Sequence, residues 1–174
     1  MQNFRQDHFH EKEEVTMGEN TITAEEISKA QQVWGEGIVA IGNASAAGGD
    51  FVRAAEKHID TLYDFQSGPV LFKPTKAADV QFRMTRESAL SYFIGGNDKF
   101  KEDHGFALHP WINVRFENAG TFINGNYAVA MGNYFFKQTD GTEVKVEYTF
   151  GYIKNNEGRL KINLHHSSLP FSAG

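Results

Sequence analysis

The sequence has 174 residues, with 17 Lys and Arg against 22 Asp and Glu, and it contains no cysteine. This length suits one domain that buries roughly 70% of the surface of its unfolded chain. The lack of cysteine excludes disulfides, thiolate metal sites and cysteine nucleophiles. The net charge of −5, without a block of Lys and Arg, argues against nucleic acid as a partner, and no window is apolar enough to span a membrane.

The start of the chain differs in composition from the rest. Residues 1–21 are rich in Gln, Glu, Lys and His and contain few apolar positions, so they predict a flexible N-terminal arm. A single domain is then expected over residues 22–174. Because the start has no apolar signal core, we expect a cytoplasmic protein, or a periplasmic or secreted one if an export signal has been removed.

Three helices are predicted in the first half of the chain. Thr23 and Glu26 form a capping-box pattern, and apolar residues at three- and four-residue spacing continue it into one long helix over residues 23–46. Asp50 is a suitable cap for a second helix over residues 51–63, and Thr85 for a third over residues 86–94. Between the last two, the prolines that bracket residues 69–74 (PVLFKP) indicate a short edge strand.

The final third of the sequence changes to a two-residue period that is typical of strands. Turn signals separate four expected antiparallel strands, at residues 111–123, 127–138, 142–154 and 159–167. Gly120, Gly132 and Gly151 lie inside these strands and predict bends or bulges that curl the sheet. Helices followed by strands predict an α+β fold in which helices pack on one face of a curved antiparallel sheet.

The last strand contains the first chemical candidate. In LKINLHHSS (residues 160–168), strict alternation places His166 on the face of Leu160, Ile162 and Leu164, and His165 on the opposite face. An imidazole on that apolar face is a possible general base, because its reference pKa lies near neutral pH. A structural histidine that hydrogen-bonds to Ser or to the backbone is the other interpretation.

Two further groups have both a functional and a structural interpretation. Asp103, His104, His109 and Trp111 precede the first long strand and could serve proton transfer or only solubility. Tyr148, Phe150 and Tyr152 share one strand face, which suits either a pocket for an apolar or planar ligand or an ordinary core. The phosphate-loop, dinucleotide, GxSxG and HExxH motifs do not occur, and we expect neither a cofactor nor a metal.

Three segments resemble the nuclear transport factor 2-like (cystatin-like α+β) superfamily. They are the long first helix, the LFKP of residues 71–74 and VEYTFGYIKNNEGRLKINLHHSSLP of residues 146–170. Within that superfamily the chain resembles the association domain of calcium/calmodulin-dependent protein kinase II and its bacterial relatives, near the SnoaL-like cyclases. The resemblance implies a cone-shaped sheet wrapped around the long helix, a deep pocket, and pairing of sheets into dimers or rings.

The resemblance also implies a set of site residues. His166 occupies the family's histidine position near the pocket and is the one catalytic candidate. Phe150 and Met131 stand where association domains place pocket arginines, which implies a more apolar pocket, with Arg83 or Arg115 as replacement charges. The expected pocket comprises Trp34, Arg83, Trp111, Met131, Tyr148, Phe150 and His166.

Three functions follow from these observations. The first is a homo-oligomeric domain, a homodimer or larger, that binds a small apolar or aromatic molecule in the concave face of the sheet without established catalysis. The second is an isomerase, cyclase or hydratase in which His166 acts as acid and base, oriented by Glu147, Asp103 or Tyr148. The third is an interaction module whose aromatic sheet face forms the contact.

Overall fold

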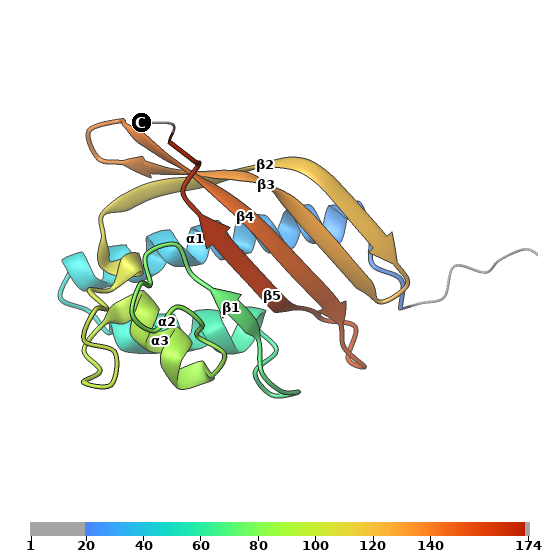
Figure 1. Ribbon diagram of the computed structural model, residues 1–174, viewed down its shortest axis with the longest axis horizontal. Coiled ribbons are helices and arrows are strands. Elements are labelled where there is room, and N and C mark those ends of the chain that lie inside the picture. Colours follow the sequence, from blue (N-terminus) through green and yellow to red (C-terminus); the bar gives the residue numbers. More distant parts are fainter. Residues whose placement is uncertain (1–19, 173–174) are drawn as a thin grey trace, which may run out of the picture.

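The computed structural model describes residues 20–172 (Figure 1). The expected N-terminal arm therefore lies outside the described residues, apart from its last two. In chain order the elements are α1 (Ala24–Ala46), α2 (Phe51–Leu62), β1 (Leu71–Lys73), α3 (Arg86–Ile94), the 3₁₀ helix η1 (Phe106–Leu108), β2 (Trp111–Asn124), β3 (Tyr127–Gln138), β4 (Glu143–Lys154) and β5 (Leu160–Ser168).

Each of the three helices begins directly after the residue whose side chain was expected to cap it. The Thr23 hydroxyl accepts the Glu26 N–H, and the Glu26 carboxylate accepts the Thr23 N–H, which completes the capping box of α1. Asp50 accepts the Arg53 N–H at the start of α2, and Thr85 caps α3. These contacts satisfy amide groups that have no partner inside the helix, so local sequence fixes where each helix starts.

The five strands form one sheet in the order β1-β5-β4-β3-β2. The four long strands are antiparallel, as expected. Strand β1 lies at the edge, also as expected, but it pairs with β5 in parallel, so the sheet is mixed rather than wholly antiparallel. The parallel pairing follows from the long connection through α3, η1 and the other strands, which brings β5 back alongside β1 in the same direction.

Glycines and register shifts curve the sheet. The pairing of β2 with β3 shifts between Asn118 and Gly120, and the pairing of β4 with β5 shifts between Gly151 and Tyr152. At Gly132 a Cβ atom would lie 2.1 Å from the backbone oxygen of Glu117, so only glycine allows the strands to approach so closely. The expectation that the glycines mark bends and bulges is confirmed at these positions.

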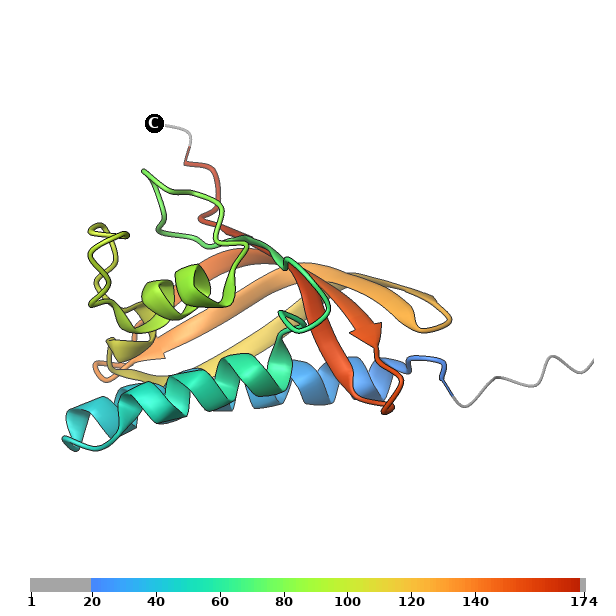
Figure 2. The ribbon, with the colours of Figure 1, turned by 90° about the horizontal axis from the view of Figure 1, so that it is seen from below.

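The long helix covers the concave face of this sheet. Figures 1 and 2 show α1 running along the sheet with α2 beside it, and α1 packs against both β2 and α2. The buried stripe of α1 includes Ile27, Trp34, Ile38 and Ile41, and it meets the inward side chains of β3 and β4. The α+β fold with a curved sheet around the first helix is thus confirmed. Over residues 20–172, no helix combines the length and the apolar character that crossing a membrane requires.

Candidate functional site

The last strand points His165, not His166, into the interior. The His165 side chain is 2% exposed, whereas His166 is exposed on the outer face of the sheet. In the pairing with β4, His165 lies opposite the buried Phe150 and His166 lies opposite Thr149. The expectation that His166 faces the concave side of the sheet is therefore wrong.

A β-bulge in β5 is the reason for this reversal. Gly151 pairs with Leu164 and Tyr152 pairs with Ile162, so Asn163 is an extra residue without a partner on β4. One extra residue exchanges the two faces for every position that follows it. Alternation counted from Leu160 is consequently correct up to Ile162 and reversed from Leu164 to Ser168.

A small cavity, which we call the enclosed cavity because most of the side chains that line it are buried, lies next to His165. Its free volume of about 10 Å³ is room for about one water-sized molecule. Aromatic rings and four hydroxyl groups form its wall, contributed by α1, β1, the loop after β1, α3, η1, β3 and β5. The lining residues are Trp34, Phe72, Pro74, Thr75, Tyr92, Phe93, Phe106, Tyr134, His165 and Ser167.

A continuous chain of hydrogen bonds passes through the two ring nitrogens of His165. Trp34 Nε1 donates to Tyr63 Oη over 2.8 Å, and Tyr63 Oη lies 2.9 Å from His165 Nδ1. On the other side of the ring, His165 Nε2 lies 2.9 Å from Ser167 Oγ, which is hydrogen-bonded to Tyr134 Oη. All five side chains are buried, so the network is shielded from competing water.

Burial also determines the charge state of these groups. Desolvation holds the pKa of His165 well below its ordinary value, and the nearby His58 and His166 lower it further. The same cause raises the pKa of the Tyr63, Tyr92 and Tyr134 hydroxyls above the usual range. Near neutral pH the cavity therefore carries a neutral imidazole and protonated phenols, a set of hydrogen-bond donors without formal charge.

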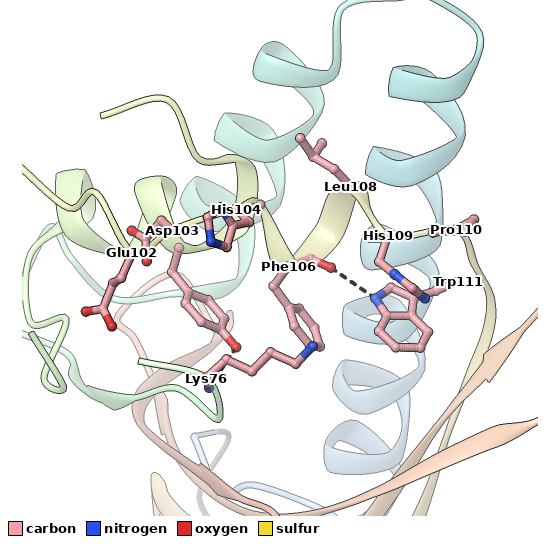
Figure 3. A pocket seen from close by; sticks show the side chains of 11 residues that line it. Lys76, Glu102, Asp103, His104, Phe106, Leu108, His109, Pro110 and Trp111 are labelled. Atoms are coloured by element: carbon pink, nitrogen blue, oxygen red, sulfur yellow. Dashed lines mark hydrogen bonds between the residues drawn. The ribbon is translucent and has the colours of Figure 1, made fainter. Parts of the chain in front are cut away.

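A larger hollow lies beside the enclosed cavity (Figure 3). It has a volume of about 640 Å³ and shares two lining residues with the cavity, Tyr92 and Phe106, whose rings stack with centroids 5.5 Å apart. Figure 3 shows Lys76, His104 and His109 around this hollow, with the Trp111 indole donating to the Phe106 carbonyl over 3.0 Å. The rings of Tyr92 and Phe106 thus line both the enclosed cavity and the larger hollow.

Four of the expected pocket residues lie on the concave side. Trp34 lines the enclosed cavity, and the Phe150 ring meets the His165 ring edge-on with centroids 4.2 Å apart. Tyr148 is buried in the core, where it accepts a hydrogen bond from Gln31 over 3.1 Å. Trp111 lines the larger hollow instead.

The other three expected residues lie elsewhere. Met131 and His166 belong to the outer face of the sheet, where they line a shallow hollow of about 420 Å³. Met131 points outward because β3 alternates, and its neighbours Ala130 and Gly132 occupy the inner face. Arg83 is fully buried, but its guanidinium pairs with Glu102 and Asp103 and does not serve as a pocket cation. Arg115 likewise pairs with Glu117 and Glu143.

Of the residues that line the cavity, the expected pocket contained only Trp34, and the sequence interpretation also missed the hydroxyl groups of the network and the cavity. Tyr63, Thr75, Tyr92, Tyr134 and Ser167 come from separate elements and share no motif. The alternation of β3 was a usable signal, because it places Tyr134 on the same face as the apolar Ala128, Ala130 and Phe136. Within residues 20–172, no cluster of three or more His, Cys, Asp and Glu side chains could hold a metal ion.

Comparison with known proteins relates this chain to a defined family. The model of the metal-independent carbonic anhydrase family matches residues 25–169. The metal-independent carbonic anhydrase of Nostoc sp. (strain PCC 7120) is 46% identical over 153 residues, which cover 86% of this chain and 75% of that protein.

Solved structures agree with this relationship. The crystal structure of a cyanobacterial iota-carbonic anhydrase complexed with bicarbonate is 45% identical, with a TM-score of 0.86 over 88% of this chain and 95% of the other. A putative calcium/calmodulin-dependent protein kinase II association domain from Xanthomonas campestris has a TM-score of 0.58 at 23% identity, over 87% of this chain and 91% of that one. The similarity to the association domain confirms the expected fold. Because the family model and the Nostoc enzyme both match most of the chain, the chain belongs to the metal-independent carbonic anhydrase family.

Proposed function

We propose that this protein interconverts carbon dioxide and bicarbonate at the enclosed cavity beside His165. The observation that carries the proposal is the donor set itself, in which Ser167, Tyr134 and the imidazole of His165 meet at one buried point. Membership of the carbonic anhydrase family supports it, as does the bicarbonate bound to the cyanobacterial relative.

This proposal replaces the first two of the three functions expected from the sequence. A ligand-binding domain without established catalysis is contradicted by the match to an enzyme family over residues 25–169. The same match overturns an isomerase, cyclase or hydratase working through His166, and His166 lies on the far side of the sheet from the cavity. We retain the expectation of a small-molecule ligand. Its expected apolar or aromatic character is replaced, because a polar oxyanion fits the hydroxyl groups of the cavity better.

The cavity suits both partners of the reaction. In hydration, a water oxygen bonds to the carbon of CO₂ while one C=O electron pair moves onto oxygen, and the water releases one proton to the buffer. Apolar rings of Phe72, Phe93 and Phe106 suit the uncharged CO₂, and hydroxyl donors suit the negative oxygen that develops. Donors aimed at developing charge in a buried site stabilise the transition state without reorganisation.

Access to the cavity requires side chains to move. A free volume of about 10 Å³ holds about one water molecule, so CO₂ and water do not fit together in this state. Tyr92 and Phe106 separate the cavity from the larger hollow, and their displacement would join the two spaces. The larger hollow is then the route by which substrate arrives from solvent.

A pair of neighbouring histidines offers a matched test. We expect the purified protein to accelerate CO₂ hydration in stopped-flow indicator assays, and to keep this activity after treatment with a metal chelator. His165→Gln should lower kcat/KM by roughly 10²-fold or more, since removing one such donor has effects of that size. His166→Gln, on the outer face, should retain activity within about twofold. Equal loss in both variants, or no activity in the wild type, would contradict the proposal.

Assembly into a homodimer or larger oligomer is a further part of the proposal. Phe122 pairs with Val129 on the outer face of the sheet, on the same side as Met131, and Phe122 and Met131 are 63% and 52% exposed. Exposed apolar side chains grouped on one sheet face support a contact with a second copy. Native mass spectrometry of the wild type and of Phe122→Lys measures it: we expect a dimer or larger for the first and more monomer for the second.

A further inference from the structure

The indole of Trp34 and the hydroxyl of Tyr63 act as a positioning pair: we propose that they hold His165 in the tautomer with its proton on Nε2. In this tautomer the imidazole donates a hydrogen bond into the cavity instead of accepting a proton there. The inference rests on the proposed function for its catalytic meaning, but the tautomer itself is a property of the unliganded protein. It assigns roles to Trp34 and Tyr63, neither of which was expected to determine the chemistry.

The direction of the chain is set at its start. An indole N–H can only donate, so the 2.8 Å contact makes Tyr63 Oη the acceptor from Trp34. Tyr63 still has one hydroxyl hydrogen, which needs an acceptor because the side chain is only 2% exposed. The one acceptor bonded to this hydroxyl among the described residues is His165 Nδ1, 2.9 Å away. Nδ1 must therefore be unprotonated for every group to be satisfied.

The opposite tautomer leaves a donor without a partner. If Nδ1 carried the proton, it would donate to Tyr63 Oη, which already accepts from Trp34. The hydroxyl hydrogen of Tyr63 would then point into a packed aromatic surrounding, since its ring contacts Phe65, Phe72 and Phe93. A buried donor without an acceptor costs the full desolvation of that group. This asymmetry favours the proton on Nε2.

The consequence reaches the cavity through Ser167. With its proton on Nε2, His165 donates to Ser167 Oγ over 2.9 Å. Ser167 Oγ then has its own hydrogen to give, either to Tyr134 or to an oxygen atom of the substrate. His165 is consequently a neutral donor that polarises the hydroxyl beside it, a use of neutral imidazole known from other enzymes. It cannot be the group that removes a proton from water in the resting state, because Nδ1 accepts from Tyr63 and Nε2 is already protonated.

Nuclear magnetic resonance measures the tautomer directly. In protein labelled with ¹⁵N-histidine, long-range proton-nitrogen spectra distinguish a protonated ring nitrogen from an unprotonated one. We expect the His165 signals, assigned by their loss in His165→Gln, to show a protonated Nε2 and an unprotonated Nδ1 at neutral pH. A protonated Nδ1 in an active protein would overturn the inference and leave the proposed function standing.

A second tyrosine provides the matched variant. Tyr63→Phe removes the donor to Nδ1, so we expect a mixture of the two His165 tautomers. We also expect kcat to fall about tenfold, because the free energy of one hydrogen bond corresponds to a rate change of about that size. Tyr152→Phe deletes a hydroxyl that is equally buried but has no hydrogen-bond partner within residues 20–172, so it should change neither the nitrogen signals nor kcat.

Three outcomes decide the matter. An altered tautomer and lower kcat in Tyr63→Phe, with neither in Tyr152→Phe, would support the inference. Unchanged His165 signals in folded Tyr63→Phe would overturn it, whatever the activity. A wild type with the expected tautomer but no CO₂ hydration would overturn the role given to His165 together with the proposed function, and would leave only the hydrogen-bond assignment.

Discussion

Arg83 and Asp103 form a two-point ion pair in the interior, with Nη1 2.6 Å from Oδ2 and Nη2 2.8 Å from Oδ1. Their side chains are 0% and 2% exposed. Ser91, which precedes Tyr92 on α3, also donates to Asp103 Oδ2 over 2.6 Å. The ion pair thus joins the segment before α3 to the loop after it, and the Ser91 hydrogen bond ties that loop to the helix that brings Tyr92 to the cavity.

Breaking this pair should destabilise the protein strongly. Asp103→Asn leaves the Arg83 guanidinium buried with a weaker partner, and loss of one member of a buried pair costs about 3 kcal/mol or more. We expect the melting temperature to fall by roughly 10 °C. The control is Lys99→Ala, which removes an exposed ion pair to Glu87 on α3 and should cost less than about 1 kcal/mol. Equal shifts for the two variants would contradict this account.

Two adjacent serines should differ sharply in their effect on activity. Ser167 is buried against His165 and Tyr134, whereas Ser168 lies on the outer face and donates to Glu147 over 3.0 Å. Ser167→Ala should lower kcat by roughly 10² to 10³-fold, because it removes a donor to the developing oxyanion. Ser168→Ala should stay within about twofold. Steady-state rates of CO₂ hydration by both variants measure the difference. An unchanged kcat in Ser167→Ala would contradict the placement of the active site at this cavity.

Two buried histidines should make folding stability depend on pH between about 4.5 and 6.5. Burial lowers the pKa of His58 to about 3 and holds that of His165 well below its ordinary value. Both stay neutral in the folded protein but gain a proton in the unfolded chain below about pH 6.5. Their contribution to stability is therefore present above pH 6.5 and is lost as the pH falls, by roughly 3 kcal/mol per pH unit for the pair.

The His58→Leu variant isolates half of this effect. His58 Nε2 is buried and none of the described residues forms a hydrogen bond with it, so an apolar side chain of similar size should cost little at pH 8. The slope of unfolding free energy against pH, from urea titrations between pH 4.5 and 6.5, should fall to about half. The stabilisation by carboxylates such as Glu102, whose pKa is lowered from 4.5 to about 2 by amide and Arg83 hydrogen bonds, is present above pH 4.5 and is lost mainly below that pH. An unchanged slope would show that His58 is protonated in the folded state.

Two glycines of β2 and β3 should respond differently to alanine. At Gly132 a Cβ would meet the Glu117 backbone oxygen at 2.1 Å, whereas a Cβ at Gly120 would have no described residue other than its chain neighbours within 4 Å. Gly132→Ala should destabilise by about 1 to 3 kcal/mol, because backbone atoms of a paired strand cannot move aside. Gly120→Ala should change stability by less than about 0.5 kcal/mol. Chemical denaturation of both variants checks the pair.

Much of the fold was predictable because it depends on local signals. Thr23, Asp50 and Thr85 cap the helices as expected, and the turn glycines Gly125 and Gly141 separate the long strands at positive φ. These features depend on neighbours a few residues apart, so sequence alone contains them. The expected family was correct only at the level of the fold.

The site was less predictable because its residues are far apart in the sequence. Tyr63 and His165 are 102 positions apart, and no spacing rule joins them. Whether His165 or His166 points inward depends on the bulge at Asn163, and a strict two-residue alternation does not predict a bulge. Arg83 appeared to be a spare cation because its partners Glu102 and Asp103 lie about 20 positions further on.

The bulge gives the run His165-His166-Ser167-Ser168 an unusual property. The run contains two copies of the pattern His-x-Ser, offset by one residue, and the sheet can present only one copy to the cavity at a time. A regular ladder without the bulge would turn His166 and Ser168 inward in place of His165 and Ser167. A slip of one position in this part of the strand would therefore bring a chemically identical pair of side chains, His166 and Ser168, to the inner face.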